Sequence, residues 1–102
     1  NVPESDFMIL AFKMKKKYRN ILPSAVHIDG SSRPQIVKKK TNKRFYKLLK
    51  EFEKITGHPI LINTSFNIQG EPIVNHPSHA IRCFSGTGID YLAIGSFLLS
   101  KQ

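Results

Sequence analysis

Two polar segments of the sequence carry residue types that could bind a phosphorylated molecule. They span residues 27–35 and 63–71. An arginine guanidinium can grip two phosphate oxygens at once, while hydroxyls and amides can bond phosphate or the edge of adenine. The segments supply three candidate catalytic residues and six candidate substrate- or nucleotide-binding residues: respectively Arg33, His27 and Asp29, then Gln35, Asn63, Thr64, Ser65, Asn67 and Glu71.

Each of these residues also has a plainer interpretation. His27 could be a strand histidine with satisfied hydrogen bonds, Asp29 could be a turn residue, and Arg33 could be solvated. The hydroxyls of the second segment could bond the backbone of their own turn. The sequence leaves both interpretations open.

No metal site is predicted. His58, His76 and His79 lie at expected loop or helix ends, without cysteine or carboxylate at ligand spacing. Cys83 is the single cysteine, which excludes an internal disulfide and a four-cysteine zinc site. We interpret it as a buried structural thiol. The lack of disulfides suits a reducing compartment, and we expect a cytoplasmic protein.

The composition favours one domain with an anionic partner. The chain has 102 residues and a formal net charge of +9. Thirteen of its 16 lysines and arginines lie between Lys13 and Lys50, where Asp29 is the only acid. Such a basic half favours a phosphate ligand, nucleic acid or an acidic partner, although solvated lysine-rich surfaces look the same. No apolar run approaches the ~20 residues of a membrane span, so no membrane partner is expected.

A basic RNA- or DNA-binding module is the alternative function. Its basic half would bind the phosphate backbone of the nucleic acid, and the bases would stack on Tyr18, Phe45 and Tyr46. Phe45 is better explained as part of a helix core, which makes nucleic acid the weaker of the two hypotheses.

Two helices are expected to position the polar segments. Five apolar residues recur at helical spacing and predict a helix over 43–56: Phe45, Leu48, Leu49, Phe52 and Ile55. Thr41 or Asn42 can cap its start, and Gly57 can end it. A second helix is expected to begin at Pro77, to direct Ala80, Ile81 and Phe84 or Cys83 inward, and to end at the glycines of 86–88.

The remaining chain is expected to form strands. Apolar or extended segments predict strands over 6–12, 24–28, 33–37 and 60–62, with an Asp-Gly turn over 29–32. A terminal hairpin is expected over 90–94 and 97–100, with its turn at Gly95 and Ser96. Strands interleaved with helices predict an α/β fold, a mixed twisted sheet with helices packed on it.

The motifs closely resemble those of O-carbamoyltransferases of the nodulation and antibiotic-biosynthesis type. Residues 25–35, AVHIDGSSRPQ, resemble that family's AVTHVDGTARPQ. Residues 45–67 resemble its FY..L..F...TG.P.LLNTSFN pattern, and 70–74, Pro77 and 90–92 extend the similarity. Because it covers nearly the whole chain through several spaced motifs, the resemblance is specific.

The resemblance implies that residues 1–102 are the C-terminal domain of a longer enzyme, a fragment with a partial YrdC-like fold similar to threonylcarbamoyl-adenylate synthases. The start at Asn1 agrees with a fragment. Such enzymes use ATP, with Mg²⁺, and carbamoyl phosphate to form carbamoyl-adenylate. An N-terminal domain with its own metal site, outside this chain, passes the carbamoyl group to an acceptor hydroxyl. The isolated fragment is therefore expected to be inactive, and a homodimer is left open.

Roles for individual residues follow from the same resemblance. Arg33 would clamp phosphate, His27 and Asp29 would order it, and Thr64, Ser65 and Asn67 would hold the carbamoyl or adenylate group. The chain departs from the family at 31–32, where two serines replace Thr-Ala, and at 78–79, where Ser-His replaces an acidic pair. The second change removes a favourable interaction with the helix dipole.

Overall fold

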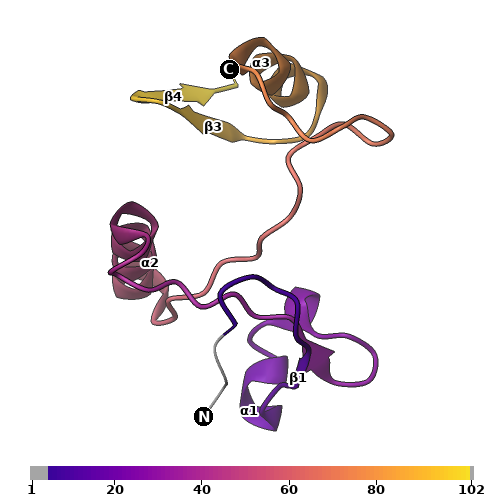
Figure 1. The fold of residues 1–102 in the computed structure, drawn as a ribbon, viewed down its shortest axis with the longest axis vertical. Coiled ribbons are helices and arrows are strands. Elements are labelled where there is room, and N and C mark those ends of the chain that lie inside the picture. Colours follow the sequence, from indigo (N-terminus) through magenta and orange to yellow (C-terminus); the bar gives the residue numbers. More distant parts are fainter. Residues whose placement is uncertain (1–4, 102) are drawn as a thin grey trace. The chain divides into compact units, whose positions relative to one another are not determined.

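The computed structural model describes residues 5–101, which divide into two compact units. We call the unit up to Ile62 the N-terminal unit and the unit from Asn63 the C-terminal unit (Figure 1). The N-terminal unit contains β1 (Phe12–Lys13), α1 (Lys16–Arg19), the 3₁₀ helix η1 (Pro23–Ala25), β2 (Ser31–Ser32) and α2 (Lys43–Thr56). The C-terminal unit contains α3 (Pro77–Gly86), β3 (Tyr91–Ile94) and β4 (Phe97–Ser100).

The sheet of the N-terminal unit is much smaller than expected. Strands β1 and β2 pair antiparallel, with Phe12 opposite Ser32 and Lys13 opposite Ser31. The strand expected over 6–12 is therefore wrong except at its end, because its partner offers only two residues. The strand expected over 24–28 is also wrong, since Pro23 opens η1, where its fixed φ suits a helical turn.

Two further strand predictions are wrong. Residues 33–37 form no strand, and their backbone has two isolated bonds with Ser5, whose Oγ donates to Pro34 O at 2.8 Å and whose carbonyl accepts from Ile36 N at 2.8 Å. Residues 60–62 lie outside any strand, with exposed side chains. Neither segment has a partner strand among residues 5–101, and hydrophobic sequence alone cannot supply one.

The helix α2 has the predicted bounds. Asn42 is its N-cap and accepts a hydrogen bond from Phe45 N at 3.1 Å through Oδ1, while Gly57 ends it with φ of 78°. No α2 residue is buried, and Ile55 is 84% exposed. On its basic face Glu51 pairs with Lys54 at 2.8 Å. The helix therefore forms from local signals. In its apolar stripe Phe45, Leu48 and Ile55 are exposed, whereas Leu49 and Phe52 are half-buried.

The C-terminal unit packs α3 and the β3–β4 hairpin around a small apolar cluster. Pro77 occupies the first turn of α3, and Ala80, Cys83 and Phe84 are buried, whereas Ile81, expected to face inward, is exposed. The hairpin is confirmed, with Leu92 opposite Leu99 and Gly95 at φ of 60°. The cluster consists of Ala80, Phe84 and Leu92, against which five half-buried residues pack: Phe66, Val74, Ile89, Ile94 and Leu99.

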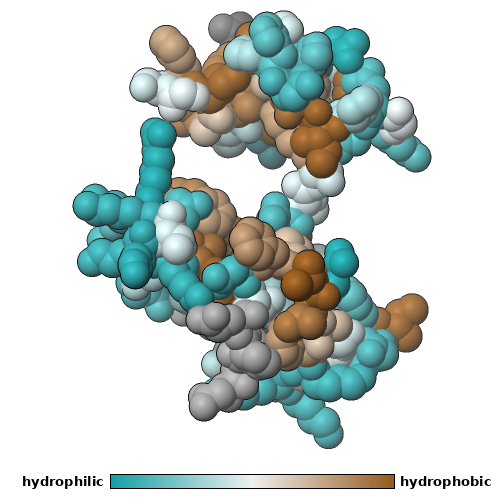
Figure 2. All heavy atoms as spheres, viewed as in Figure 1, coloured by the Kyte–Doolittle hydropathy of each residue, from teal (hydrophilic) through white to brown (hydrophobic). Residues whose placement is uncertain are grey.

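The mixed α/β class is confirmed, with two separate two-stranded antiparallel sheets in place of one sheet. Apolar side chains reach the surface of each unit (Figure 2). Across residues 5–101, no helix has the length and hydrophobicity needed to cross a membrane.

Candidate functional site

The first polar segment forms a tight turn around Gly30. His27 O accepts from Gly30 N at 2.8 Å, and His27 N donates to Ser31 O at 2.8 Å. Gly30 has φ of 78°, which suits glycine, and its carbonyl accepts from Met14 N at 3.0 Å. The predicted Asp-Gly turn is therefore confirmed, although residues 31–32 belong to β2.

Asp29 has both carboxylate oxygens engaged. Oδ1 accepts from Ser31 Oγ at 2.6 Å and from Ser31 N at 2.9 Å, and Oδ2 lies 3.1 Å from Lys13 Nζ. The Ser31 hydroxyl first, then the Ser31 amide and Lys13, hold the pKa of Asp29 far below its ordinary value. Asp29 therefore stays ionised to lower pH than an ordinary aspartate and is poorly suited to accept a proton.

His27 lies at the start of this turn with its ring exposed to solvent. Its Nδ1 is 3.2 Å from Ser31 Oγ. The sequence-predicted His27 and Asp29 are therefore connected through Ser31, which was not among the predicted site residues.

Two cations reach the turn from elements earlier in the chain. Lys13 donates from β1 to Asp29 O at 2.7 Å as well as to its carboxylate. Arg19, at the end of α1, donates Nε–H to Met14 O at 3.1 Å and packs so closely on Gly30 that a Cβ there would lie 2.8 Å from its Cζ. Sequence analysis missed both, because only the β1–β2 register, and not the spacing along the chain, brings them to the turn.

Arg33 directly follows β2 and is exposed. It forms no hydrogen bond or ion pair with the residues that the structure describes, so its guanidinium donors are available to an anion. Gln35 donates Nε2–H to Asp6 O at 3.0 Å. Gln35 also lines a half-open groove of about 340 Å³ with six other residues: Ile36, Val37, Tyr46, Leu49, Lys50 and Pro59.

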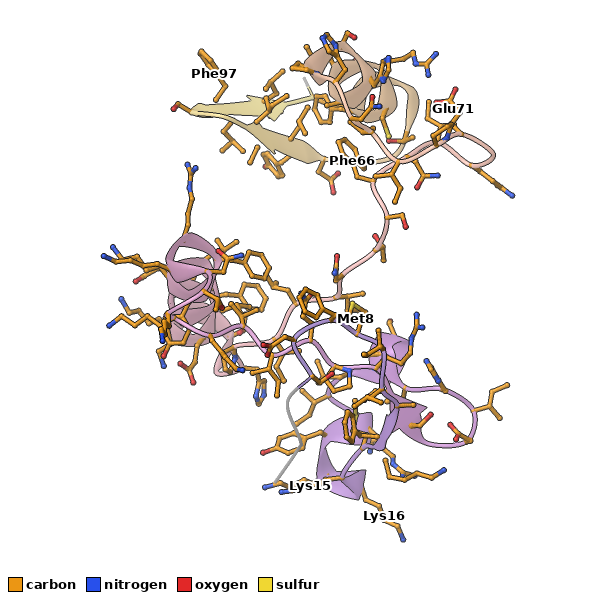
Figure 3. The ribbon with its side chains drawn as sticks, viewed as in Figure 1. Met8, Lys15, Lys16, Phe66, Glu71 and Phe97 are labelled. Atoms are coloured by element: carbon orange, nitrogen blue, oxygen red, sulfur yellow. The ribbon has the colours of Figure 1, made fainter. Side chains whose placement is uncertain are left out.

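The second polar segment divides into a structural and an accessible part. Asn67 Nδ2 donates to Ile68 O and Glu71 O, both at 3.0 Å, and Glu71 pairs with Arg82 of α3 at 2.7 Å. Figure 3 shows Glu71 in the loop that precedes α3. Asn67 and Glu71 therefore hold the loop in shape, a role the sequence did not predict for them.

Thr64 and Ser65 form the accessible part together with Asn63. All three are exposed. Within the described residues the hydroxyls of Thr64 and Ser65 make no hydrogen bond, so the alternative in which they satisfy their own turn does not hold there. Arg33 lies in the N-terminal unit and these hydroxyls in the C-terminal unit, so their meeting at one ligand stays a prediction.

The residues of the structure do not assemble a metal centre. Among residues 5–101, no three or more His, Cys, Asp or Glu side chains cluster as ligands would. The first polar segment presents cationic donors and the second presents hydroxyl donors, and each kind of donor suits an anionic ligand.

Comparison with known proteins identifies the family. The family described as Carbamoyltransferase C-terminus matches residues 1–101. The chain belongs to this family. An uncharacterised protein of Methanocaldococcus jannaschii is 48% identical over 93% of the chain. Nodulation protein NolO of Bradyrhizobium diazoefficiens is 41% identical over 94%, and Nodulation protein NolNO of Sinorhizobium fredii 38% over 97%.

The chain spans only a small part of these relatives. The matched region covers 16%, 18% and 15% of their lengths, respectively. The chain is therefore a member of the carbamoyltransferase C-terminal family and corresponds to less than a fifth of the length of each of these relatives.

Proposed function

We propose that the chain is part of an ATP-dependent O-carbamoyltransferase that binds carbamoyl phosphate and ATP and forms carbamoyl-adenylate. A preceding domain of the same parent chain would pass the carbamoyl group to an acceptor hydroxyl. The observation that carries the proposal is the family match across residues 1–101, together with Arg33, whose guanidinium has no partner among the described residues. A partial YrdC-like fold and a cytoplasmic location belong to the same proposal.

The chemistry asks for charge neutralisation and positioning more than for a nucleophile. Water would first release carbamate and inorganic phosphate from carbamoyl phosphate, and a carbamate oxygen would then attack the α-phosphorus of ATP as pyrophosphate leaves. The second step brings two anions together, so cations aimed at the phosphates lower its barrier. Arg33 would take the phosphate of carbamoyl phosphate, and Arg19 on the Gly30 turn would add positive potential, whereas the charge of Lys13 is offset by Asp29. Thr64 and Ser65 would donate hydroxyl hydrogen bonds to the carbamoyl or adenylate group.

Mg²⁺ would accompany ATP on its phosphates. Asp29 would bring little uncompensated charge to the ion, because its carboxylate is already paired with Lys13 and bonded to Ser31. Residues 5–101 offer no cluster of metal ligands, so the ion would be held by the ATP phosphates in this proposal.

Binding to the full-length parent tests the role of Arg33. Isothermal titration should show carbamoyl phosphate binding that falls about tenfold or more in Arg33→Ala, the cost of one charge-assisted hydrogen-bond pair. Arg44→Ala is the matched control, since Arg44 is also an exposed arginine without a bond to the described residues. Equal affinities for wild type and Arg33→Ala would overturn this role.

The hydroxyls of the second segment are tested with a non-hydrolysable ATP analogue and with carbamoyl phosphate. Thr64→Val and Ser65→Ala remove hydroxyls that make no bond within the described residues, so they should weaken binding without weakening the fold. Asn67→Ala serves as the contrasting variant, because Asn67 shapes its loop.

Nucleic-acid binding stays the second candidate. Phe45 is 38% exposed on α2, so it is accessible for stacking, contrary to its expected place in a helix core. Filter binding across a salt series distinguishes this candidate, because a nucleic-acid site gives a steep linear dependence of log affinity on log salt.

A further inference from the structure

The Ser31 hydroxyl links two of the predicted site residues. Its Oγ lies 2.6 Å from Asp29 Oδ1 and 3.2 Å from His27 Nδ1. Ser31 is only 7% exposed, whereas His27 and Asp29 are exposed, so the link is made by the buried member of the three.

The two contacts of the Ser31 hydroxyl, with Asp29 and with His27, constrain the tautomer of His27. A serine hydroxyl has one proton and can donate only once. Asp29 is ionised and can only accept, and the 2.6 Å separation is the short distance of a hydroxyl donating to a carboxylate. The Ser31 oxygen is then left to accept, so the proton between it and His27 must lie on Nδ1.

The turn does not need this hydroxyl for its own backbone. Ser31 N donates to Asp29 Oδ1 at 2.9 Å, and two backbone hydrogen bonds at 2.8 Å, Gly30 N to His27 O and His27 N to Ser31 O, close the turn. Removing the hydroxyl therefore leaves the loop closed, and its role toward His27 can be separated from its role in the fold.

We propose that Ser31 is a positioning residue that holds His27 with Nδ1 protonated, an arrangement that in the uncharged imidazole leaves Nε2 available as an acceptor toward solvent. This rests on the proposed function, because it also assigns the substrate end that His27 meets. An unprotonated Nε2 can accept a hydrogen bond from the amide N–H of a carbamoyl group but cannot donate to a phosphate. His27 therefore orients the carbamoyl end, while the cations near the turn take the phosphate end.

Nitrogen-15 NMR of the imidazole rings in the 102-residue chain tests the tautomer directly. At alkaline pH, where imidazole is neutral, His27 should be the Nδ1–H form, and His27→Gln identifies its signals. Ser31→Ala should move His27 toward the Nε2–H form that unrestrained imidazole prefers, and Ser31→Thr, which restores a hydroxyl, should keep the wild-type form. Ser32→Ala, a change at the neighbouring serine of β2, should leave it unchanged.

Two results would overturn the proposal. One is the Nε2–H form for wild-type His27, a measurement that needs no variant to fold. The other is an unchanged Nδ1–H form in Ser31→Ala with the other resonances in their wild-type positions.

Ligand binding by the full-length parent tests the substrate end separately. Ser31→Ala should weaken carbamoyl phosphate about fivefold, the effect of one lost neutral hydrogen bond, and inorganic phosphate by less than about twofold. Equal weakening of both ligands would contradict the assignment of the carbamoyl end. If neither ligand binds wild type while the tautomer behaves as expected, the proposed function fails and the positioning of His27 stands.

Discussion

Each of the two units is stabilised internally by a different kind of interaction. Among residues 5–101, all the buried hydrophobic residues, Ala80, Cys83, Phe84 and Leu92, belong to the C-terminal unit. The two buried polar residues, Ser5 and Ser31, belong to the N-terminal unit. Apolar burial is worth ~1.5–3 kcal/mol per large side chain, and a hydrogen bond ~1 kcal/mol net. The C-terminal unit therefore has a core of its own, and the N-terminal unit depends on many weaker bonds.

The largest effect is expected from the core of the C-terminal unit. Phe84→Ala removes a side chain that is 5% exposed and should cost about 3–5 kcal/mol. Phe97→Ala, at a side chain that is 75% exposed, is the matched control and should cost less than about 0.5 kcal/mol. Amide hydrogen exchange should show lost protection in α3 while α2 is unchanged. Lost protection in both helices would mean that the two units unfold together, which would contradict the inference that the C-terminal unit has a core of its own.

The next effect is expected at Gly30 of the N-terminal unit. Gly30→Ala would strain a residue with φ of 78°, and its Cβ, 2.8 Å from the flexible Arg19 guanidinium, would displace that group from its hydrogen bond to Met14 O. We expect a cost of about 2–3 kcal/mol from the strain and the lost bond together. Gly70→Ala shares the strain, with φ of 85°, but has nothing within 4 Å, and should cost about 1–2 kcal/mol. Urea denaturation measures both. A Gly70 variant as unstable as the Gly30 variant would show that the packing of Arg19 contributes nothing.

A smaller effect is expected at the start of α2. Asn42→Ala removes the side chain that accepts from Phe45 N and should destabilise the helix by about 1 kcal/mol. Thr41→Ala is the control, because Thr41 donates to Lys38 O and does not cap the helix. Helix content followed by circular dichroism during thermal unfolding should separate the two variants, and similar melting curves would remove the cap from the explanation of α2.

The smallest effect is expected from acid titration of Asp29. Because its pKa is lower folded than unfolded, this carboxylate favours folding above pH ~4 and loses that contribution as pH falls toward the folded pKa. In NMR titrations Ser31→Ala should raise the midpoint of Asp29 more than Lys13→Ala does, since the Ser31 hydroxyl is the largest cause of the depression. The reverse order would make Lys13 the main influence on this anion.

The helices α2 and α3 and the hairpin could be predicted because their signals are local. The apolar spacing of α2, its Asn42 cap and Gly57 stop all lie within one segment, and Pro77 and Gly95 mark α3 and the hairpin in the same way. The strands of the N-terminal unit could not be predicted, because a two-residue ladder depends on which distant segment lies beside it.

The candidate site shows the same division. The Asp-Gly turn that carries Asp29 is readable in the sequence, and so is the exposed Arg33. The approach of Lys13 and Arg19 to that turn comes from the β1–β2 pairing and has no signal in the spacing. The expected meeting of Arg33 with Thr64 and Ser65 depends on how two units are placed and stays a prediction.

The exposed part of the apolar stripe of α2 has a practical consequence for purifying the chain. The helix is amphipathic, with lysines on one side and exposed Phe45, Leu48 and Ile55 on the other, so it can adsorb to apolar surfaces. Salt screens the lysine charges and so reduces the repulsion between molecules, which leaves hydrophobic association through the apolar side of the helix. The chain should therefore be retained on phenyl resin at high ammonium sulfate and be recovered best in dilute, low-salt buffer.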